Sequence, residues 1–227
     1  ELRARIRAEA HVHAEANKQR AEADEAKREE RELQLAERAA QAALDGHIEE
    51  ARQTFAQVTE STTDLQILFL AYDFYKRIGD WNVAEQMMER SLDLSDRDAH
   101  TAKTAAALGN LGAIYLNHGD LDEAEKMHFR SLEINEHIGC KEGMADDYGN
   151  LALVYRGRDE LRKAEEMLLK SLKVNEELGH MAGIATQYGN LGNVYLKLAD
   201  PDRAEKMHFK ALEIDEKLDH KEGVARH

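Results

Sequence analysis

The chain has 227 residues, with 31 Lys and Arg against 45 Asp and Glu, and its formal net charge is -14. Binding to a phosphate backbone requires a basic surface, so this charge argues against nucleic acid and favours a protein or peptide partner. The longest strongly apolar run, residues 67–72, is too short to span a bilayer, so we expect no membrane insertion. The single cysteine, Cys140, cannot form an internal disulfide, which favours a reducing, cytoplasmic location.

The first 45 residues contain neither Gly nor Pro and are rich in Ala, Glu, Arg and Lys, which are good helix formers. Their apolar positions are too sparse to predict a heptad seam, so a solvated single helix is favoured over a coiled-coil dimer. We expect a charged helix over residues 1–30. Its continuation is expected to become the first helix of a degenerate repeat over residues 31–64.

A segment of eight residues then returns every 40 positions, and self-similarity at such a period is typical of a stacked helical solenoid. The copies are residues 108–115, 148–155 and 188–195. The apolar spacing is helical and there is only one proline, which predicts the all-α class. The expected architecture is an α-α superhelix of helix-turn-helix repeats over 65–104, 105–144, 145–184 and 185–224, followed by the truncated start of a further repeat. We interpret the chain as a fragment of a longer protein.

Glycine and acidic residues mark the expected boundary between the two helices of each repeat. The first helices should end near Gly79, Gly119 and Gly157, and the second helices should start after Asp80, Asp120, Glu160 and Asp200. Asp is a good N-cap residue. Glu123 follows Asp120 by three residues, which predicts an approximate capping box.

The order of small and large positions in these repeats resembles the tetratricopeptide repeat. The matching positions are Leu111, Gly112, Tyr115, Ala124, His128 and Ser131, and again Tyr188, Leu191, Gly192, Tyr195, Ala204, His208 and Ala211. The 40-residue length is most similar to the long-repeat branch that includes kinesin light chains and GoLoco-containing polarity adaptors. Tyr72 stands at the position of Gly112, and Leu70 at that of Asn110, so we expect the early repeats to pack differently.

Positions i, i+4, i+7 and i+11 share one stripe of a helix, and in three first helices this stripe is small or polar. The resemblance implies that first helices line a concave groove and that one asparagine per repeat holds the backbone of an extended peptide. An amide suits this role because it offers both a donor and an acceptor. The predicted peptide-binding residues are Asn110, Asn150 and Asn190, together with Asn117, Asp146, Asn193 and Lys197, of which the last three would tune the choice of side chain.

Two interpretations compete with this hypothesis. The asparagines could simply tie one helix to the next by hydrogen bonds. Residues 46–227 hold 22 Lys and Arg against 34 Asp and Glu, and this acidity could attract a basic or amphipathic segment or merely solvate the outer surface.

No motif for catalysis or for a cofactor is present in the sequence, since it has no phosphate-binding glycine loop, no Gly-x-Ser-x-Gly and no His-Glu-x-x-His. His128 and His208 occupy an aromatic position of the repeat, so we expect them to pack rather than bind metal. The predicted function is a non-catalytic protein-protein interaction module or scaffold. The alternatives are self-assembly, through the N-terminal helix or the exposed face of the last repeat, and regulation of a catalytic or membrane domain outside the fragment.

Overall fold

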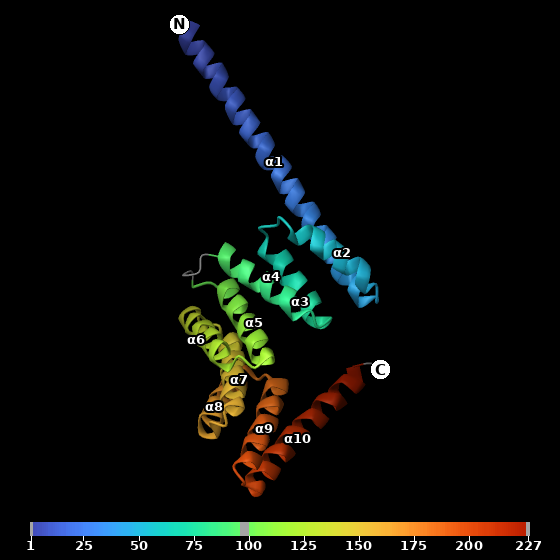
Figure 1. Cartoon of the computed structure of the whole chain (residues 1–227), viewed down its shortest axis with the longest axis vertical. Helices are drawn as coiled ribbons and strands as arrows, with labels where there is room; N and C mark the ends of the chain where they lie inside the picture. Colours follow the sequence, from blue (N-terminus) through green and yellow to red (C-terminus); the bar gives the residue numbers. More distant parts are fainter. Residues whose placement is uncertain (1, 96–99, 226–227) are drawn as a thin grey trace. The chain divides into compact units, whose positions relative to one another are not determined.

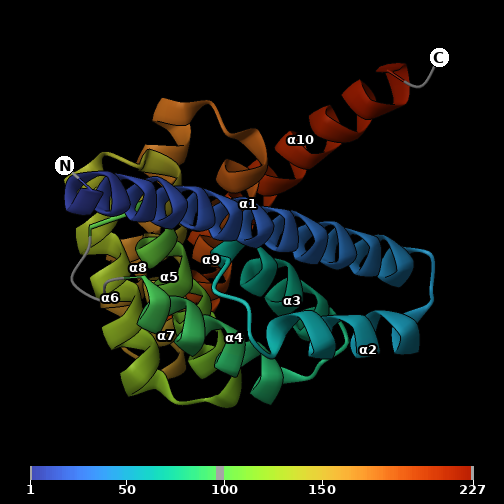
Figure 2. The same cartoon turned by 90° about the horizontal axis from the view of Figure 1, so that it is seen from above.

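The computed structural model describes residues 2–95 and 100–225, with side chains described for residues 15–95 and 100–218. All regular structure within these ranges is α-helical, which confirms the predicted class (Figures 1 and 2). The chain forms two compact units, Glu1–Arg90 (unit 1) and Ser91–His227 (unit 2), with the division inside helix α4. The 40-residue period does not predict this division.

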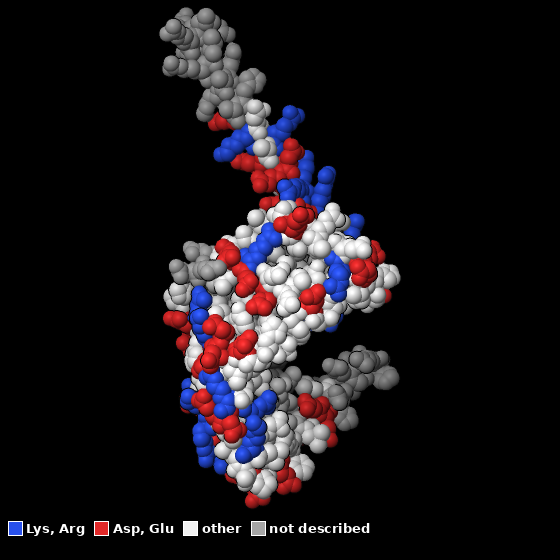
Figure 3. Space-filling model, in the orientation of Figure 1, with Lys and Arg blue, Asp and Glu red and all other residues white. Residues whose placement is uncertain are grey.

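Unit 1 contains α1 (Leu2–Leu44), α2 (Ile48–Thr59), α3 (Leu65–Arg77) and most of α4 (Trp81–Leu94). Residues 15–31 of α1 are all exposed, and Figure 3 shows acidic and basic side chains interspersed along this segment. Exposed ion pairs one turn apart, such as Arg28 with Glu32 at 2.8 Å, add little to stability, so the good helix formers of this segment provide the main local support. From Glu32 onward α1 begins to be buried, and Ala36, Ala39 and Ala43 lie in the core where α1 packs against α2 and α3.

Aromatic side chains fill the interior of unit 1. The rings of Phe55 and Phe74 stack with their centroids 5.0 Å apart, and Tyr75 meets Phe74 edge-on at the same distance. Tyr72 is fully buried, and it occupies the repeat position at which the next repeat has Gly112. A whole tyrosine side chain therefore occupies a position that the later repeats keep small, and this confirms that the early helices pack differently.

Unit 2 contains three helix pairs, and consecutive helices pack together. The helices are α5 (Ala102–His118), α6 (Leu121–Ile138), α7 (Lys141–Gly157), α8 (Leu161–Leu178), α9 (Met181–Lys197) and α10 (Pro201–Ala225). The first helices α5 and α7 also contact each other. The observed helix ends agree with the positions that glycine and acidic residues predict.

The predicted capping box at the start of α6 is wrong. The Asp120 side chain makes no capping hydrogen bond, and Glu123 instead pairs with Lys126 at 3.2 Å. The Asp120 amide is already used, because it donates to the carbonyl of Tyr115 while Gly119, at φ +85°, donates to Leu116. This is a Schellman turn, which satisfies the end of α5 rather than the start of α6. Asp200 does cap α10, accepting from the Arg203 amide at 3.1 Å.

Two turns take a form that the sequence does not predict. Asp159 and Ala199 adopt left-handed conformations, at φ +62° and +56°, where the equivalent turn after α5 has Gly119. The left-handed region is unfavourable for alanine, which has a Cβ and no side-chain hydrogen bond to compensate.

The last helix is longer than the earlier second helices. Gly139 and Gly179 end α6 and α8 in left-handed conformations, whereas Asp219 occupies this position in α10 and the helix continues to Ala225. The residues expected to start a further repeat therefore belong to α10 as far as Ala225, and Arg226 and His227 lie outside the described residues. No helix in the described ranges is long and apolar enough to cross a membrane.

Candidate functional site

The predicted peptide-binding residues all lie at the surface of α5, α7 and α9. We define the asparagine face by its three stripes, Ala106, Asn110, Ala113 and Asn117, then Asp146, Asn150, Leu153 and Gly157, then Thr186, Asn190, Asn193 and Lys197. Each of these residues is half-buried or exposed. The leucine that follows each asparagine is buried, so the stripe is the side of each helix turned away from the core.

The three asparagines of this face differ in their contacts. Asn110 interacts with another part of the protein. The side-chain amides of Asn150 and Asn190 make no hydrogen bond to any residue that the structure describes, and both remain half-buried. The competing interpretation, in which asparagines of this row tie helices together, therefore receives no support from Asn150 and Asn190.

A second pair of asparagines is hydrogen-bonded inside the protein, and it is absent from the predicted set. Asn135 and Asn175 are buried on α6 and α8. The Asn135 amide donates to Asp147 Oδ2 at 2.8 Å and so ties α6 to α7, whereas the Asn175 amide donates to the Ser171 carbonyl of its own helix at 2.9 Å. The backbone carbonyls of both residues accept from the residue before the next helix, at 2.9 Å.

The glycines of the long turn explain how these two asparagines fit. A Cβ on Gly143 would lie 2.5 Å from the Asn135 amide, and one on Gly183 would lie closer still to the Asn175 oxygen. Only glycine leaves room for the amide against the start of the next first helix. The signal was present in the sequence, because each asparagine is followed by a glycine eight residues later and both recur at the 40-residue period.

Buried serine and histidine side chains complete the packing between helices. Ser131 Oγ donates to the Ala105 carbonyl at 3.0 Å, and Ser171 repeats the bond to Ala145 at 2.7 Å.

His128 is fully buried with Nδ1 3.3 Å from Asp147 Oδ1, and a Cβ on Gly112 would lie 2.7 Å from its ring. Its role as a packing residue is confirmed. Among the described residues no group of His, Cys, Asp and Glu could hold a metal ion.

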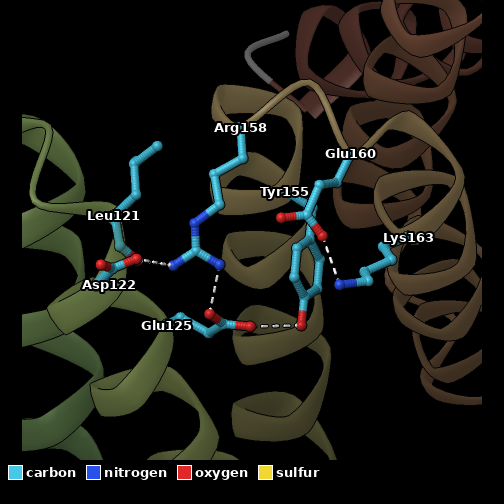
Figure 4. A network of polar contacts seen from close by, with 7 residues as sticks. All are labelled: Leu121, Asp122, Glu125, Tyr155, Arg158, Glu160 and Lys163. Carbon is cyan, nitrogen blue, oxygen red and sulfur yellow. Dashed lines mark hydrogen bonds and ion pairs between the residues drawn. The ribbon is translucent and has the colours of Figure 1, made fainter.

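A polar network joins neighbouring repeats near the C-terminal ends of the first helices (Figure 4). The Tyr155 hydroxyl donates to Glu125 Oε1 at 2.7 Å, and Arg158 donates to Glu125 and Asp122. Burial and the hydrogen bond to Glu125 raise the pKa of Tyr155 to about 12. Burial opposes ionisation of Glu125, but the bonds from Tyr155 and Arg158 outweigh it and lower the pKa of this carboxyl. Tyr195 and Glu165 repeat the bond at 2.8 Å, so the network is a structural connection between repeats.

Two charged residues of the asparagine face lie in different environments. Lys197 Nζ is 3.4 Å from Asp159 Oδ1, and this exposed pair contributes little to stability. Asp146 is exposed to solvent, yet the surrounding protein removes enough water to raise its pKa, and the Asp147 carboxylate adds to this effect. His180 partly offsets the rise, but no cation in the described ranges lies within ion-pair distance of Asp146. A cation that binds next to Asp146 would stabilise its charged form.

Comparisons with known proteins agree with this architecture. A family model described as Tetratricopeptide repeat matches residues 67–137 and 144–217. No curated protein sequence matches the chain at a significant level.

Solved structures share the fold at low sequence identity. BtubC (BKLC) from P. vanneervenii has a TM-score of 0.72 and 21% identity over 82% of this chain and 80% of that one. The apo form of RapI has a TM-score of 0.75 and 16% identity, over 86% of this chain and 74% of that one. A putative kinesin light chain from Podosopora anserina, with nearly identical TPR-like repeats, has a TM-score of 0.66 and 16% identity, over 83% of this chain and 96% of that one.

Proposed function

This chain belongs to the tetratricopeptide repeat family, and we propose that it binds an extended segment of another protein across the asparagine face of α5, α7 and α9. Repeats of this family form scaffolds for protein-protein interaction, and the helical array of unit 2 is such a scaffold. The partner on this proposal is a peptide, not a nucleic acid, and the array acts by binding without catalysis or a cofactor. The single cysteine favours the cytoplasm as the location.

The contrast between two pairs of asparagines carries the proposal. Asn135 and Asn175 are buried and hydrogen-bonded, so structure alone accounts for them. Asn150 and Asn190 recur at the same period, but their amides have no hydrogen-bond partner among the described residues. A half-buried amide without a partner can gain hydrogen bonds from a ligand at little cost in lost hydration.

An extended peptide supplies the groups that such amides need. Each of its backbone units presents an N–H donor and a C=O acceptor, and one asparagine side chain can bind both. Asn150 and Asn190 would provide two such contacts in successive repeats, and Asn110 and Asn117 would extend the row across α5. Such hydrogen bonds are made to the peptide backbone and are therefore independent of the peptide sequence.

The charged residues of the face would select the peptide side chains. Glu142 lies one helical turn before Asp146, and repulsion between the two carboxylates would be relieved by a cation bound next to them. We expect a Lys or Arg of the partner to contact Asp146. Lys197 can leave its exposed pair with Asp159 at little cost and would accept an acidic side chain, with Asn193 beside it on the same stripe.

A phage-displayed library of random peptides, selected against the whole chain, tests the proposal. We expect the selected peptides to lose at least about tenfold in affinity for the variant with Asn150→Ala and Asn190→Ala, since each lost amide contact removes about 1 kcal/mol. The matched control is Asn82→Ala, because Asn82 is an exposed asparagine on α4. Peptides that bind the double variant and the wild type equally would show that the asparagine face is not the binding site.

A further inference from the structure

The second helices of the repeats in unit 2, α6, α8 and α10 (the outer helices), each expose a large apolar residue at the same position of the repeat. Phe129, Leu169 and Phe209 are 44%, 47% and 62% exposed and lie 40 positions apart on α6, α8 and α10. A single exposed apolar side chain is ordinary on a protein surface. Because these three residues occupy the same position of the repeat, the same side of each outer helix presents an apolar group to solvent.

A groove of about 440 Å³ lies beside the first of these residues, between α6 and α8. Its apolar lining is Phe129, Leu132, Met167 and the ring of Tyr148. Tyr148 is two residues from Asn150, which places it about 200° further round α7 at 3.6 residues per turn. The groove and the asparagine face are therefore on opposite sides of α7 and can be occupied independently.

Two of the four charged residues that line the groove have partners inside the protein. The Tyr148 hydroxyl donates to Glu136 Oε1 at 3.1 Å. Lys170 Nζ pairs with Glu166 at 2.8 Å and lies 5.7 Å from the centre of the Tyr148 ring. These contacts hold Tyr148 in the floor of the groove.

The other two charged residues, Arg130 and Glu133, have no ion-pair partner among the described residues. They lie three positions apart on α6, next to Phe129. A partner that offers an acid to Arg130, a base to Glu133 and an apolar group to the lining would therefore complement this groove. Figure 3 shows acidic and basic side chains interspersed over the face that α6 and α8 present, with no uniform patch of either sign.

We infer that the groove binds a second copy of this chain, with the two α6 helices antiparallel across a twofold axis. A twofold interface pairs a surface with itself, so the Arg130 of each copy faces the Glu133 of the other. The Phe129 of each copy enters the groove of the other and removes its ring from water. A uniformly acidic or basic partner would instead meet one like charge at Glu133 or at Arg130.

The interface is small, because it is centred on one helix and one groove of each copy. Interfaces at the low end of the size range form transient complexes, so the dimer is in equilibrium with the monomer and depends on concentration. The inference concerns a face other than the asparagine face, and it does not depend on the proposed peptide binding.

Sedimentation velocity of the whole chain over about a hundredfold range of concentration tests the inference. We expect the wild type to shift from monomer to dimer, and Phe129→Ala to raise the dissociation constant about tenfold or more, as loss of a central aromatic anchor does. Leu196→Ala is the matched control, because Leu196 is 56% exposed on α9 outside the groove, and it should leave the equilibrium unchanged. A wild type that stays monomeric throughout overturns the inference, and so does a Phe129→Ala variant that dimerises normally.

Charge exchange separates this interface from a nonspecific apolar contact. Arg130→Glu puts two acids opposite each other and should weaken the dimer, whereas the double variant with Arg130→Glu and Glu133→Arg restores opposite charges and should dimerise again. Failure of the double variant to recover, with circular dichroism unchanged, contradicts the antiparallel arrangement. The Asn150→Ala and Asn190→Ala variant should dimerise like the wild type, so the two proposals fail separately.

Discussion

Unit 1 fills its interior with aromatic rings, whereas unit 2 combines leucines and small residues with a repeated set of buried polar groups. At the position of Gly112, unit 1 buries the whole side chain of Tyr72. Unit 2 keeps that position small, because the ring of His128 lies against it, and ties α6 to α7 through Asn135 and Asp147. Helical repeats thus support two kinds of core, one held by apolar volume and the other partly by hydrogen bonds that require a defined geometry.

The largest effect is expected in the aromatic core. Tyr72→Ala should lower the free energy of unfolding of unit 1 by about 3–5 kcal/mol, because it leaves a large cavity. Trp81, the only tryptophan, lies at the start of α4 in unit 1, so its fluorescence during urea unfolding reports this unit. Tyr72→Phe is the control: the Tyr72 hydroxyl is buried without a hydrogen-bond partner among the described residues, so its removal should cost nothing or stabilise the unit. A loss of stability in Tyr72→Phe as large as in Tyr72→Ala would contradict this account.

The second effect is expected in the polar core of unit 2. Asn135→Ala should cost about 2–3 kcal/mol, because it removes a 2.8 Å hydrogen bond to the buried Asp147 carboxylate. Asn150→Ala should change stability by no more than about 0.5 kcal/mol, since its amide bonds to no described residue. Far-UV circular dichroism during urea unfolding measures both. Equal losses would remove the distinction between structural and binding asparagines.

Alkaline pH should weaken both units through different tyrosines. Burial raises the pKa of Tyr72 to about 12, and burial with the bond to Glu125 raises that of Tyr155 to about 12. The folded state holds both protons more tightly than the unfolded chain, whose tyrosine pKa is about 10. Their contribution to stability is therefore complete below pH ~10 and is lost as the pH rises towards 12. Thermal unfolding measures this loss of stability between about pH 10 and 12. Compared with the wild type, Tyr72→Phe should lose less stability when Trp81 fluorescence is followed, and Tyr155→Phe should lose less when circular dichroism is followed.

The smallest effect is expected at a turn. Ala199 has φ +56°, so Ala199→Gly should stabilise unit 2 by about 0.5–1 kcal/mol, the relief of left-handed strain less the entropy cost of glycine. Gly119 has φ +85°, so Gly119→Ala should destabilise unit 2 by a similar amount. The midpoint of urea unfolding measures both changes. A stabilised Gly119→Ala variant would show that these turns tolerate a Cβ.

Most of the fold could be predicted from the sequence, because helix ends and packing positions depend on neighbours within one repeat. The glycine and acidic residues located the ends of α3, α5 and α7 and the starts of α4, α6, α8 and α10 within a few residues. The tyrosine at position 72 predicted a different core in unit 1. The capping box at Asp120 was wrong because its amide serves the turn that ends α5. The left-handed Asp159 and Ala199 were missed because neither residue type signals that conformation.

By itself the sequence determined the period, the helical class and the stripe of asparagines on the first helices, since these follow from spacing along the chain. Only the tertiary structure decided which asparagine amides are satisfied inside the protein. Asn135 reaches Asp147 on the next helix, whereas Asn150 and Asn190 face away from the core. Both pairs recur every 40 residues, and the difference arises from which side of each helix packs against its neighbour. The groove between α6 and α8, with Arg130 and Glu133 unpaired among the described residues, likewise exists only once both helices pack against α7.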